Sequence, residues 1–501
     1  MKKWIKRIAI TFMGLFSLLT IIGIGLWMVA RPESPEVPPI GEITFDLDDG
    51  STLNGEFATL EVPENRNRPD SRSISIAYLR IKGDVDSSAP PMFLLAGGPG
   101  GSYMENMNGG GITAAISVAY INTMRKFGDV IIPDLRGVHY SQPNYLCDGS
   151  VGSWPAVRSE EALRNVLTTS ARACRENLVA DGFDLEGYTV LQAAQDIVDL
   201  ATHLGYEDFR VMGGSFGSHL AMTLMKYHPD RIDRAIVYGV EGYDHTYDNP
   251  AAVRETVTKI SEMSAGVWKA AGREGDPLLA LDTEVAASLE GDDNPSQLLP
   301  FELALFGMNG QGFSLYKRAT MTSWPNYVAK LIDGGLTGQA FFFRNAGGLL
   351  LAPRGWSGSA VGLFDCASGL SKARRETMTQ ADSPLFNRMS FTYYDAICAG
   401  WNVPELPDSF REASPVTVPT LFVQGDMDFA TPFSNATETI INFPESHLVV
   451  VGNGSHSAFF EALTETEEMP RVVTDWLNGK APATNRINLP AVVFDSVVAK
   501  D

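Results

Sequence analysis

The chain has 501 residues, of which 44% are hydrophobic, and carries a formal net charge of −21 at pH 7 from 60 acidic and 39 basic residues. The apolar content suffices for a large buried core and argues against an intrinsically disordered chain. The excess of negative charge argues against a partner that presents phosphates along an extended surface, so nucleic acid is not an expected ligand.

The first thirty residues have the composition of a membrane anchor. Four basic residues among the first seven precede an uncharged, largely apolar run at residues 8–30. As a helix this run would span roughly 34 Å, which is enough to cross a bilayer. We expect an uncleaved anchor, because Met28 stands where a signal-peptidase site after Ala30 needs a small residue. The positive-inside rule then places the rest of the chain outside the membrane, periplasmic or extracellular in a bacterium; secretion after cleavage is the alternative.

Short β-branched and apolar runs follow, separated by Gly/Pro-rich turns and helical stretches. The runs that we expect to form strands are residues 73–81, 92–95, 129–132, 209–212, 235–240, 420–423 and 448–451. Residues 191–204 show the apolar spacing of a helix instead. This alternation predicts an α/β fold with a mostly parallel sheet flanked by helices.

Residues 241–411 interrupt the β/α alternation. The interval is far longer than an ordinary loop, so it must carry its own secondary structure, and we expect a mostly helical inserted cap. The predicted segments are an anchor with a Pro-rich spacer at 1–40, the first part of the core at 41–240, the cap at 241–411 and the second part of the core at 412–501.

A G-x-S-x-G sequence centred on Ser215 directly follows the expected strand at 209–212, and a helical pattern follows it. Flanking glycines remove the Cβ atoms that would collide at so sharp a strand-to-helix turn. The hydroxyl would then project at a helix N-terminus, whose free N–H groups and dipole stabilise an anionic intermediate. In this setting the motif predicts an α/β-hydrolase fold with Ser215 as its nucleophile.

A serine nucleophile needs a histidine base, and this fold requires the chain order Ser, acid, His. The histidines well beyond Ser215 are His228, His245, His447 and His456. Only His456 lies in a loop of small residues after a final strand, so we predict that it is the base. We expect His228 to cap a helix or to be solvated, His447 to begin the last strand, and His203 and His219 to be ordinary helix residues.

The acid is expected after the strand at 420–423, where two carboxylates stand two residues apart. Asp428 is the predicted member of the triad. Asp426 is interpreted as a turn residue that bonds its own backbone.

The Gly/Pro-rich segment at residues 96–102 follows the expected strand at 92–95 and permits close approach of the backbone to a substrate oxygen. The N–H of Gly98 is predicted to form half of an oxyanion hole, since Pro99 has no N–H to donate. The N–H of Phe216 is predicted to form the other half.

The four cysteines are Cys147, Cys174, Cys366 and Cys398. They show no C-x-x-C pair or neighbouring histidine that would indicate zinc, so disulfides in an exported domain are expected. Three pairings are possible, and the spacing alone does not choose among them.

Five ordered motifs together resemble the prolyl aminopeptidase and tripeptidyl aminopeptidase family of α/β-hydrolase serine peptidases, over about residues 55–470. The motifs are the loop at 97–102, Asp134-x-Arg136-Gly137, Gly213-x-Ser215-x-Gly217, Gly425-x-x-Asp428-x-x-Thr431-Pro432 and the His456 loop. The resemblance implies a secreted or envelope peptidase that acts on peptide N-termini, with a cap over the site. It also implies that disulfides join Cys147 to Cys174 and Cys366 to Cys398.

The sequence departs from the family pattern at two positions. Ala96 stands where the family often has His or Gly, and His139 stands where it has a second glycine of the Arg-Gly-x-Gly turn. Neither position donates the expected oxyanion bonds, so the departures bear on substrate positioning rather than on catalysis. Arg136 is expected to brace the turn beneath the oxyanion loop, a structural role.

The predicted activity is that of a serine hydrolase with an acyl-enzyme mechanism, foremost an aminopeptidase that releases residues or short peptides from peptide N-termini. A carboxylester hydrolase uses the same triad and remains open, as does a membrane-tethered binding module on an inactive hydrolase fold. Nothing in the sequence indicates a metal or an organic cofactor. The expected partners are a peptide or small ester and the membrane.

An aminopeptidase has to hold a protonated α-amine at a fixed distance from its nucleophile, and a buried carboxylate is the usual means. Glu241 follows the strand that ends at Val240, so it should emerge at the carboxyl edge of the sheet on the side of Ser215. We expect Glu241 to anchor the amine; alternatively it caps the next segment or pairs with a basic residue.

Overall fold

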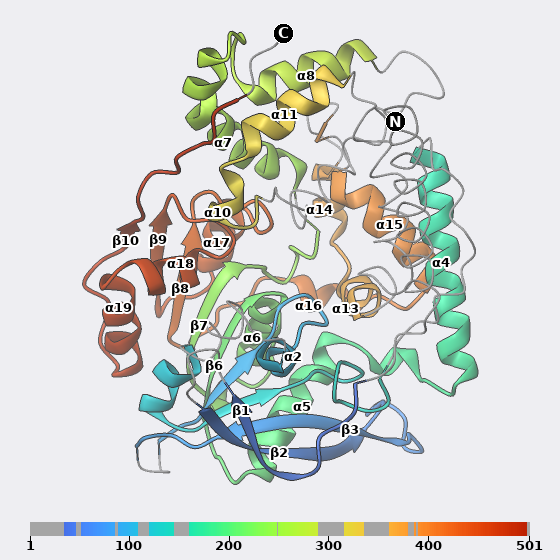
Figure 1. Cartoon of the computed structure of the whole chain (residues 1–501). Coiled ribbons are helices and arrows are strands. Elements are labelled where there is room, and N and C mark those ends of the chain that lie inside the picture. The colour runs from blue at the N-terminus through green and yellow to red at the C-terminus, as the bar shows by residue number, and fades with distance from the viewer. Residues whose placement is uncertain are drawn as a thin grey trace, which may run out of the picture.

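The computed structural model describes most of the chain (Figure 1). The described residues are 35–46, 52–85, 89–108, 120–144, 160–247, 249–288, 315–334, 360–378, 385–386 and 389–497.

A single ten-stranded sheet forms the centre of the molecule, in the order β1-β2-β3-β5-β4-β6-β7-β8-β9-β10. Pairing is antiparallel from β1 to β5 and parallel from β5 across to β10. The strands are β1 (Gly41–Asp46), β2 (Thr52–Pro63), β3 (Ser73–Ile81), β4 (Met92–Leu95), β5 (Val130–Pro133), β6 (Phe209–Ser215), β7 (Ile232–Val240), β8 (Thr420–Gly425), β9 (Ser446–Gly452) and β10 (Arg486–Asn488). The mostly parallel sheet is as predicted, with β1, β2 and β10 added at its edges.

Helices alternate with the strands of the parallel part and also fill the long interval between β7 and β8. They are α2 (Tyr103–Asn108), α4 (Glu160–Ala180), α5 (Val190–His203), α6 (Phe216–Tyr227), α7 (Pro250–Ala270), α8 (Pro277–Ser288), α10 (Arg318–Met321), α11 (Trp324–Asp333), α13 (Ala360–Ser368), α14 (Lys372–Thr377), α15 (Met389–Trp401), α16 (Asp408–Arg411), α17 (Phe433–Ile440), α18 (Ala458–Glu465) and α19 (Glu468–Leu477).

Each face of the sheet packs against its own layer of helices, because successive strand residues point to opposite faces. In β6, Phe209 and Val211 join the core formed with α5 and α6. Met212, between Val211 and the elbow, points to the other face and joins the core formed with α18 and α19. The central strands are therefore buried on both sides, as their continuous apolar runs require.

Part of the interval between β7 and β8 forms a separate hydrophobic cluster, which we call the cap cluster. It is built from α7, α8 and α11 and includes Trp268, Trp324 and Leu315. Figure 1 shows these helices together at the top of the view, on the opposite side of the molecule from β1–β3. The cap cluster also takes in Met427 and Phe429, which belong to the loop after β8. The cap is thus packed directly onto one loop of the sheet.

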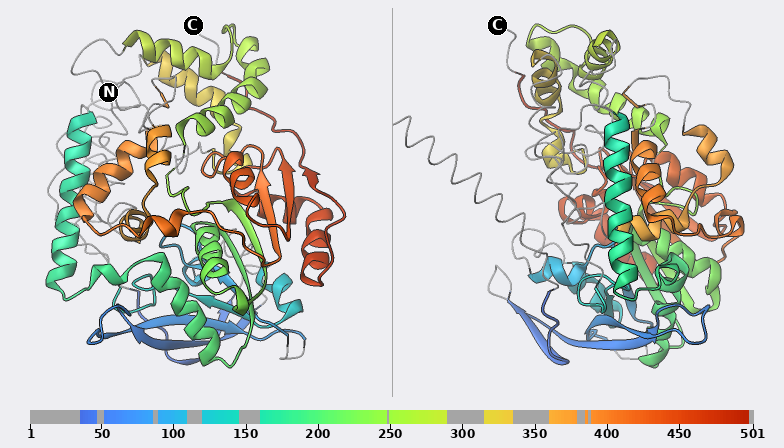
Figure 2. Two further views of the ribbon diagram at one scale, coloured as in Figure 1. Left: turned by 180° about the vertical axis from the view of Figure 1, so that it is seen from behind. Right: turned by 90° about the vertical axis from the view of Figure 1, so that its right-hand side faces the viewer.

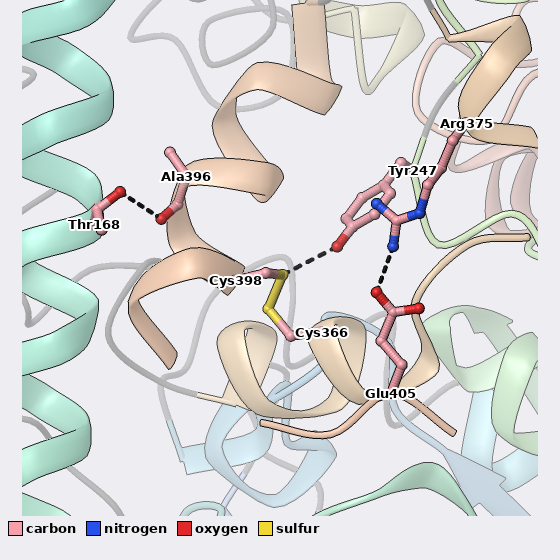
Figure 3. Close-up of a disulfide and its surroundings, with 7 residues drawn as sticks. All are labelled: Thr168, Tyr247, Cys366, Arg375, Ala396, Cys398 and Glu405. Carbon is pink, nitrogen blue, oxygen red and sulfur yellow. Dashed lines mark hydrogen bonds and ion pairs between the residues drawn. A yellow bond between two sulfur atoms is a disulfide. The ribbon is translucent and has the colours of Figure 1, made fainter. Parts of the chain in front are cut away.

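A second group of helices, α13, α14 and α15, comes from the later part of the same interval; α15 packs against α4, and α13 packs against α15 (Figures 1 and 2). A disulfide joins Cys366 in α13 to Cys398 in α15, with the two Cα atoms 5.3 Å apart. The Thr168 hydroxyl of α4 donates a hydrogen bond of 2.8 Å to the carbonyl oxygen of Ala396. The hydroxyl of Tyr247 lies 3.0 Å from the Cys398 sulfur (Figure 3). Although α4 falls outside residues 241–411, it therefore packs with the helices of that interval.

The disulfide of Cys366 with Cys398 is one of the two pairings that the resemblance implies. Cys174, on α4, also takes part in a disulfide. Its expected partner, Cys147, lies outside the described residues.

The expected membrane anchor at residues 8–30 also lies outside the described residues. Within the part of the chain that the structure describes, none of the helices combines the length and the apolar character needed to span a bilayer.

Candidate active site

Ser215 lies at the sharp turn between β6 and α6, with φ 55° and ψ −131°. This conformation is strained for a residue with a side chain, and it turns the chain within one residue from strand to helix. The flanking glycines are required sterically. A Cβ at Gly213 would overlap the carbonyl oxygen of Gly217, and a Cβ at Gly217 would overlap that of Leu95. The predicted nucleophile elbow is thus sterically possible only with this pattern of small residues.

The elbow is fastened to the end of β7 by the hydroxyl of Ser218. This hydroxyl donates to the carbonyl oxygen of Ser215 at 2.6 Å and accepts from the N–H of Glu241 at 2.9 Å. Ser218 and Glu241 are both buried. The Glu241 backbone is therefore held within two hydrogen bonds of the candidate nucleophile.

The Gly/Pro-rich loop after β4 lies directly beside the elbow. In the parallel pairing of β4 with β6, Leu95 is in register with Gly213, so the two strands end together. A Cβ built on Gly97 would stand 3.3 Å from the Cβ of Ser215. Gly98 has φ 125°, a conformation that favours glycine. Gly98 and Phe216 therefore directly follow two neighbouring residues, Gly97 and Ser215.

His456 and Asp428 form a buried pair. The Nδ1 of His456 lies 2.9 Å from Oδ1 and 3.0 Å from Oδ2 of Asp428, so Nδ1 carries the proton that it donates to the carboxylate. Asp428 is 1% exposed. The hydrogen bond fixes the tautomer and leaves Nε2 free to accept a proton.

The register of β7 brings the histidine ring next to the elbow. Ser215 is paired with Val240, and a Cβ built on the preceding residue, Gly239, would lie 3.0 Å from the Cε1 atom of His456. Among the described residues the Ser215 hydroxyl has no hydrogen-bond partner within 3.5 Å, His456 included. Such bonds are often long without a substrate and tighten when it binds.

Two family models match separate parts of the chain. Residues 90–260 match the α/β hydrolase fold, and residues 383–486 match the family described as TAP-like protein. A tripeptidyl aminopeptidase from Streptomyces coelicolor is 23% identical over 435 residues, which cover 79% of this chain and 76% of that protein. The chain has the α/β-hydrolase fold. It resembles the tripeptidyl aminopeptidases, as the ordered motifs predicted.

Solved structures of hydrolases are similar at lower identity. An α/β hydrolase from a Medee basin deep-sea metagenome library is 12% identical with a TM-score of 0.38, over 82% of this chain and 97% of the other. A serine hydrolase from Cycloclasticus zankles is 14% identical with a TM-score of 0.38, over 84% of this chain and 98% of the other.

Sequence reasoning missed two residues that position the Asp428 carboxylate. The amide of Gln424 donates to Asp428 Oδ2 at 3.0 Å, and the hydroxyl of Thr431 donates to the same oxygen at 2.7 Å. The other oxygen accepts the N–H groups of Ala430 and Thr431 at 3.0 and 2.9 Å. Gln424 also accepts the N–H of Val240 at 2.8 Å, so it links the acid to the neighbouring strand β7. The available signal in the sequence was a polar glutamine between an apolar strand run and the glycine that follows it.

The second carboxylate of the loop, Asp426, faces away from the histidine ring. It accepts the N–H of Asn453 at 2.8 Å and forms ion pairs with Lys259 at 3.0 Å and Arg486 at 2.9 Å. Asp426 therefore braces the base of the His456 loop and ties α7 to it, which is more than the local turn role that its position in the sequence indicated.

The remaining histidines have structural surroundings. His228 follows the last residue of α6, and His447 lies in β9. His219 is fully buried; its Nδ1 is 3.0 Å from the Gly242 carbonyl oxygen and its Nε2 is 3.0 Å from the Ser368 hydroxyl. Burial lowers the pKa of His219 to about 4, so it is neutral at physiological pH. It is thus a link between α6 and α13, and not an ordinary helix residue.

Arg136 is structural, as expected, but it braces different elements from those predicted. Its guanidinium is completely buried and donates two hydrogen bonds, of 2.8 and 2.7 Å, to Asp196 in α5. It also donates to the carbonyl oxygens of Glu64 and Gly187, at 2.6 and 2.5 Å. Arg136 therefore joins the end of β2 to α5.

His139 has a positive φ of 49°, a backbone conformation that favours glycine. Its Nδ1 lies 3.1 Å from the buried carboxylate of Asp134 and 3.4 Å from the hydroxyl of Ser102. The departure from the family pattern thus adds a side-chain contact to the end of the oxyanion loop.

The contact between Gln424 and Asp428 leads to a test by pH. Gln424→Glu would place a second carboxylate about 3 Å from Asp428, and two such groups cannot both ionise without a large cost. The pKa of the pair in the folded state would rise above the unfolded value, so the destabilisation relative to wild type should be small near pH 4.5 and grow as the pH rises. We expect the free energy of unfolding of the variant to be about 2–4 kcal/mol below that of wild type at pH 8, measured by unfolding between pH 4.5 and 8.

The matched variant is Gln424→Leu, which removes the same hydrogen bonds without adding a charge. It should cost about 1–3 kcal/mol at every pH in that range. If the free energy of unfolding changes equally with pH in the two variants, residue 424 does not face the carboxylate.

Proposed function

We propose that the protein is a serine hydrolase that forms an acyl-enzyme on Ser215. The observation that carries the proposal is the buried hydrogen bond of 2.9 Å from His456 Nδ1 to Asp428. The same imidazole ring lies against Gly239 of β7, and the next residue of that strand, Val240, is in register with Ser215. In this mechanism Ser215 Oγ attacks a carbonyl carbon, while Nε2 of His456 takes the hydroxyl proton. Asp428 stabilises the imidazolium that results.

The developing oxyanion has two candidate donors, the N–H groups of Gly98 and Phe216. His456 then returns its proton to the leaving group, and water activated by the same histidine hydrolyses the acyl-enzyme. The free N–H groups at the start of α6 add their dipole to the stabilisation of the negative charge.

We infer that the substrate is a peptide with a free N-terminus. The resemblance to a tripeptidyl aminopeptidase and the cap packed over the acid loop support this choice over a carboxylester. A carboxylester hydrolase is the alternative enzyme. An inactive binding module is disfavoured, because an unused site has no need of a strained serine and a five-donor buried carboxylate.

An active-site fluorophosphonate tests the mechanism. We expect one label per chain, and none on Ser215→Ala, because only the elbow serine has a base beside it. His456→Ala should lower kcat by several orders of magnitude, and Asp428→Asn should cost a comparable amount. Asp426→Asn is the matched control for the acid, with a much smaller loss of kcat. Stoichiometric labelling of Ser215→Ala would refute the assignment of the nucleophile, and a greater loss in Asp426→Asn would refute that of the acid.

A second experiment tests which residue binds the free amine of the substrate. We propose that Glu241 anchors it, since Glu241 is 8% exposed, follows β7 at the carboxyl edge of the sheet and shares Ser218 with the elbow. Losing one partner of a buried ion pair typically costs about 3–5 kcal/mol. Glu241→Gln should therefore lower kcat/KM for free-amine peptides at least a hundredfold and leave neutral short-chain esters nearly unchanged.

The controls for this test are a second charge and a second substrate. Glu405→Gln removes a half-exposed carboxylate that is paired with Arg375 in the cap, and it should change neither activity. Peptides with an acetylated N-terminus should be poor substrates of the wild type. If acetylated and free peptides are cleaved equally well, the enzyme is an endopeptidase or an esterase.

We further propose that residues 8–30 anchor the hydrolase in the membrane, with the catalytic domain on the outer side. The support is the basic cluster and the uncharged run in the sequence. The full chain should stay with the membrane fraction after alkaline carbonate extraction, and a chain without residues 1–40 should be released. Release of the intact full chain by carbonate would leave secretion as the explanation.

A further inference from the structure

An aromatic side chain from the cap covers the candidate base. The ring centroid of Tyr316 lies 4.3 Å from that of His456, and the two planes meet at 66°. Tyr316 is half-buried and follows Leu315, which is fully buried in the cap cluster. The histidine therefore has the Asp428 carboxylate on one ring nitrogen and a tyrosine ring against its surface.

The position of Tyr316 is set by Glu461, which lies one turn into the helix that follows His456. Glu461 accepts the N–H of Ser455 at 3.0 Å and the hydroxyl of Ser455 at 2.7 Å. It also accepts the N–H of Arg318 at 3.0 Å, from the cap side. One carboxylate thus holds the residue before the histidine and the residue two places after the tyrosine.

Further contacts of Arg318 reinforce this attachment. Its guanidinium pairs with Glu465 at 2.7 Å and donates to the Pro490 carbonyl oxygen at 2.7 Å. The hydroxyl of Ser455 also lies 2.9 Å from the Tyr316 carbonyl oxygen. The short cap segment at residues 315–318 is therefore fixed to the histidine loop at both its backbone and its side chains.

The cap holds the acid loop as well. The hydroxyl of Thr256 in α7 donates to the Asp428 carbonyl oxygen at 3.3 Å, and Lys259 donates to that of Asp426 at 3.1 Å. Met427 and Phe429, on either side of Asp428, are buried in the cap cluster. Both members of the buried pair are consequently attached to the same body of the cap.

We propose that Tyr316 is a positioning residue for His456, held in place by Glu461; this role rests on the proposed serine-hydrolase function. The aromatic ring restricts rotation of the imidazole away from Asp428 and keeps water from the hydrogen bond between them. A tyrosine ring also interacts favourably with the imidazolium that forms during catalysis. The effect belongs to the chemical step, so it should act on kcat more than on KM.

Three variants separate the ring from its support. Tyr316→Ala should lower kcat about tenfold, the usual contribution of an aromatic pair, with KM changed less than about twofold. Tyr316→Phe retains the ring and should restore kcat to near wild type. Glu461→Gln should fall between them, because its amide would turn an N–H toward groups that are themselves donors.

The control for a general loss of cap packing is Tyr327→Ala. Tyr327 packs on Trp324 in the cap cluster, so its removal takes an aromatic ring from the same body. We expect its kcat within about twofold of wild type. Two outcomes would overturn the proposal: an effect of Tyr316→Ala on KM alone, or Tyr316→Phe as impaired as Tyr316→Ala.

A measurement without substrate keeps this test apart from that of the proposed function. The His456 Nδ1 proton, shielded and bonded to Asp428, should give a low-field proton resonance in the full chain, identified by its loss in His456→Ala. The resonance should broaden through exchange with water in Tyr316→Ala and persist in Tyr316→Phe and Tyr327→Ala. A sharp, unchanged resonance in Tyr316→Ala would refute the positioning role, whereas failure of fluorophosphonate labelling with the resonance present would refute only the hydrolase function.

Discussion

A buried carboxylate is the constraint on which the site depends. Asp428 is almost fully removed from water, and an ionised carboxylate can remain there only if its oxygens accept enough hydrogen bonds. Gln424, Ala430, Thr431 and His456 supply them. The donors come from three local features: a strand end, the turn after it, and the loop after the next strand. The carboxylate thereby fixes these segments relative to one another before any substrate is bound.

The strained serine imposes a second constraint, which acts through sterics. The backbone conformation of Ser215 costs on the order of 1–3 kcal/mol and persists because its surroundings allow no alternative. Gly214 shows how tight they are, since a Cβ there would overlap the ring of Tyr238. Tyr238 in turn stacks on Phe459 and lies 3.0 Å from the hydroxyl of Tyr103. One ring beneath the elbow thus contacts the segments that follow the oxyanion loop and the histidine.

The parts of the site that the sequence predicted are those encoded by short motifs. The turn at Ser215 needs small residues at fixed offsets, and the loops of Asp428 and His456 each follow a recognisable strand, so local patterns were enough to place them. Two contacts that were missed join residues far apart in the chain. Gln424 contacts Val240, and Tyr316 contacts His456, and no spacing rule connects either pair.

The same distinction holds for the fold. The central strands were predicted because burial on both faces requires continuous apolar runs, whereas β1 and β2, at the edge, carry mixed patterns with little signal. The association of α4 with α15 was not predictable, because it brings together segments more than two hundred residues apart, with Arg164 paired to Asp395 and Thr168 bonded to Ala396. Arg136 shows the limit for a single residue: its structural role was evident, but its partners were not.

The cap contacts the catalytic elements from two sides, and this bears on how a substrate reaches them. On one side Tyr316 and Leu315 attach it to the histidine and acid loops. On the other, the ring of Phe364 in α13 lies 5.6 Å from that of Phe216, and Ser368 is bonded to the neutral His219 of α6.

Lifting both groups of helices together as one rigid lid would expose these buried rings and break the buried polar contacts. The disulfide between Cys366 and Cys398 also prevents α13 from separating from α15. The described contacts therefore attach the two groups of cap helices to different catalytic elements: the first group to the histidine and acid loops, and the second group to the helix α6 that follows the elbow.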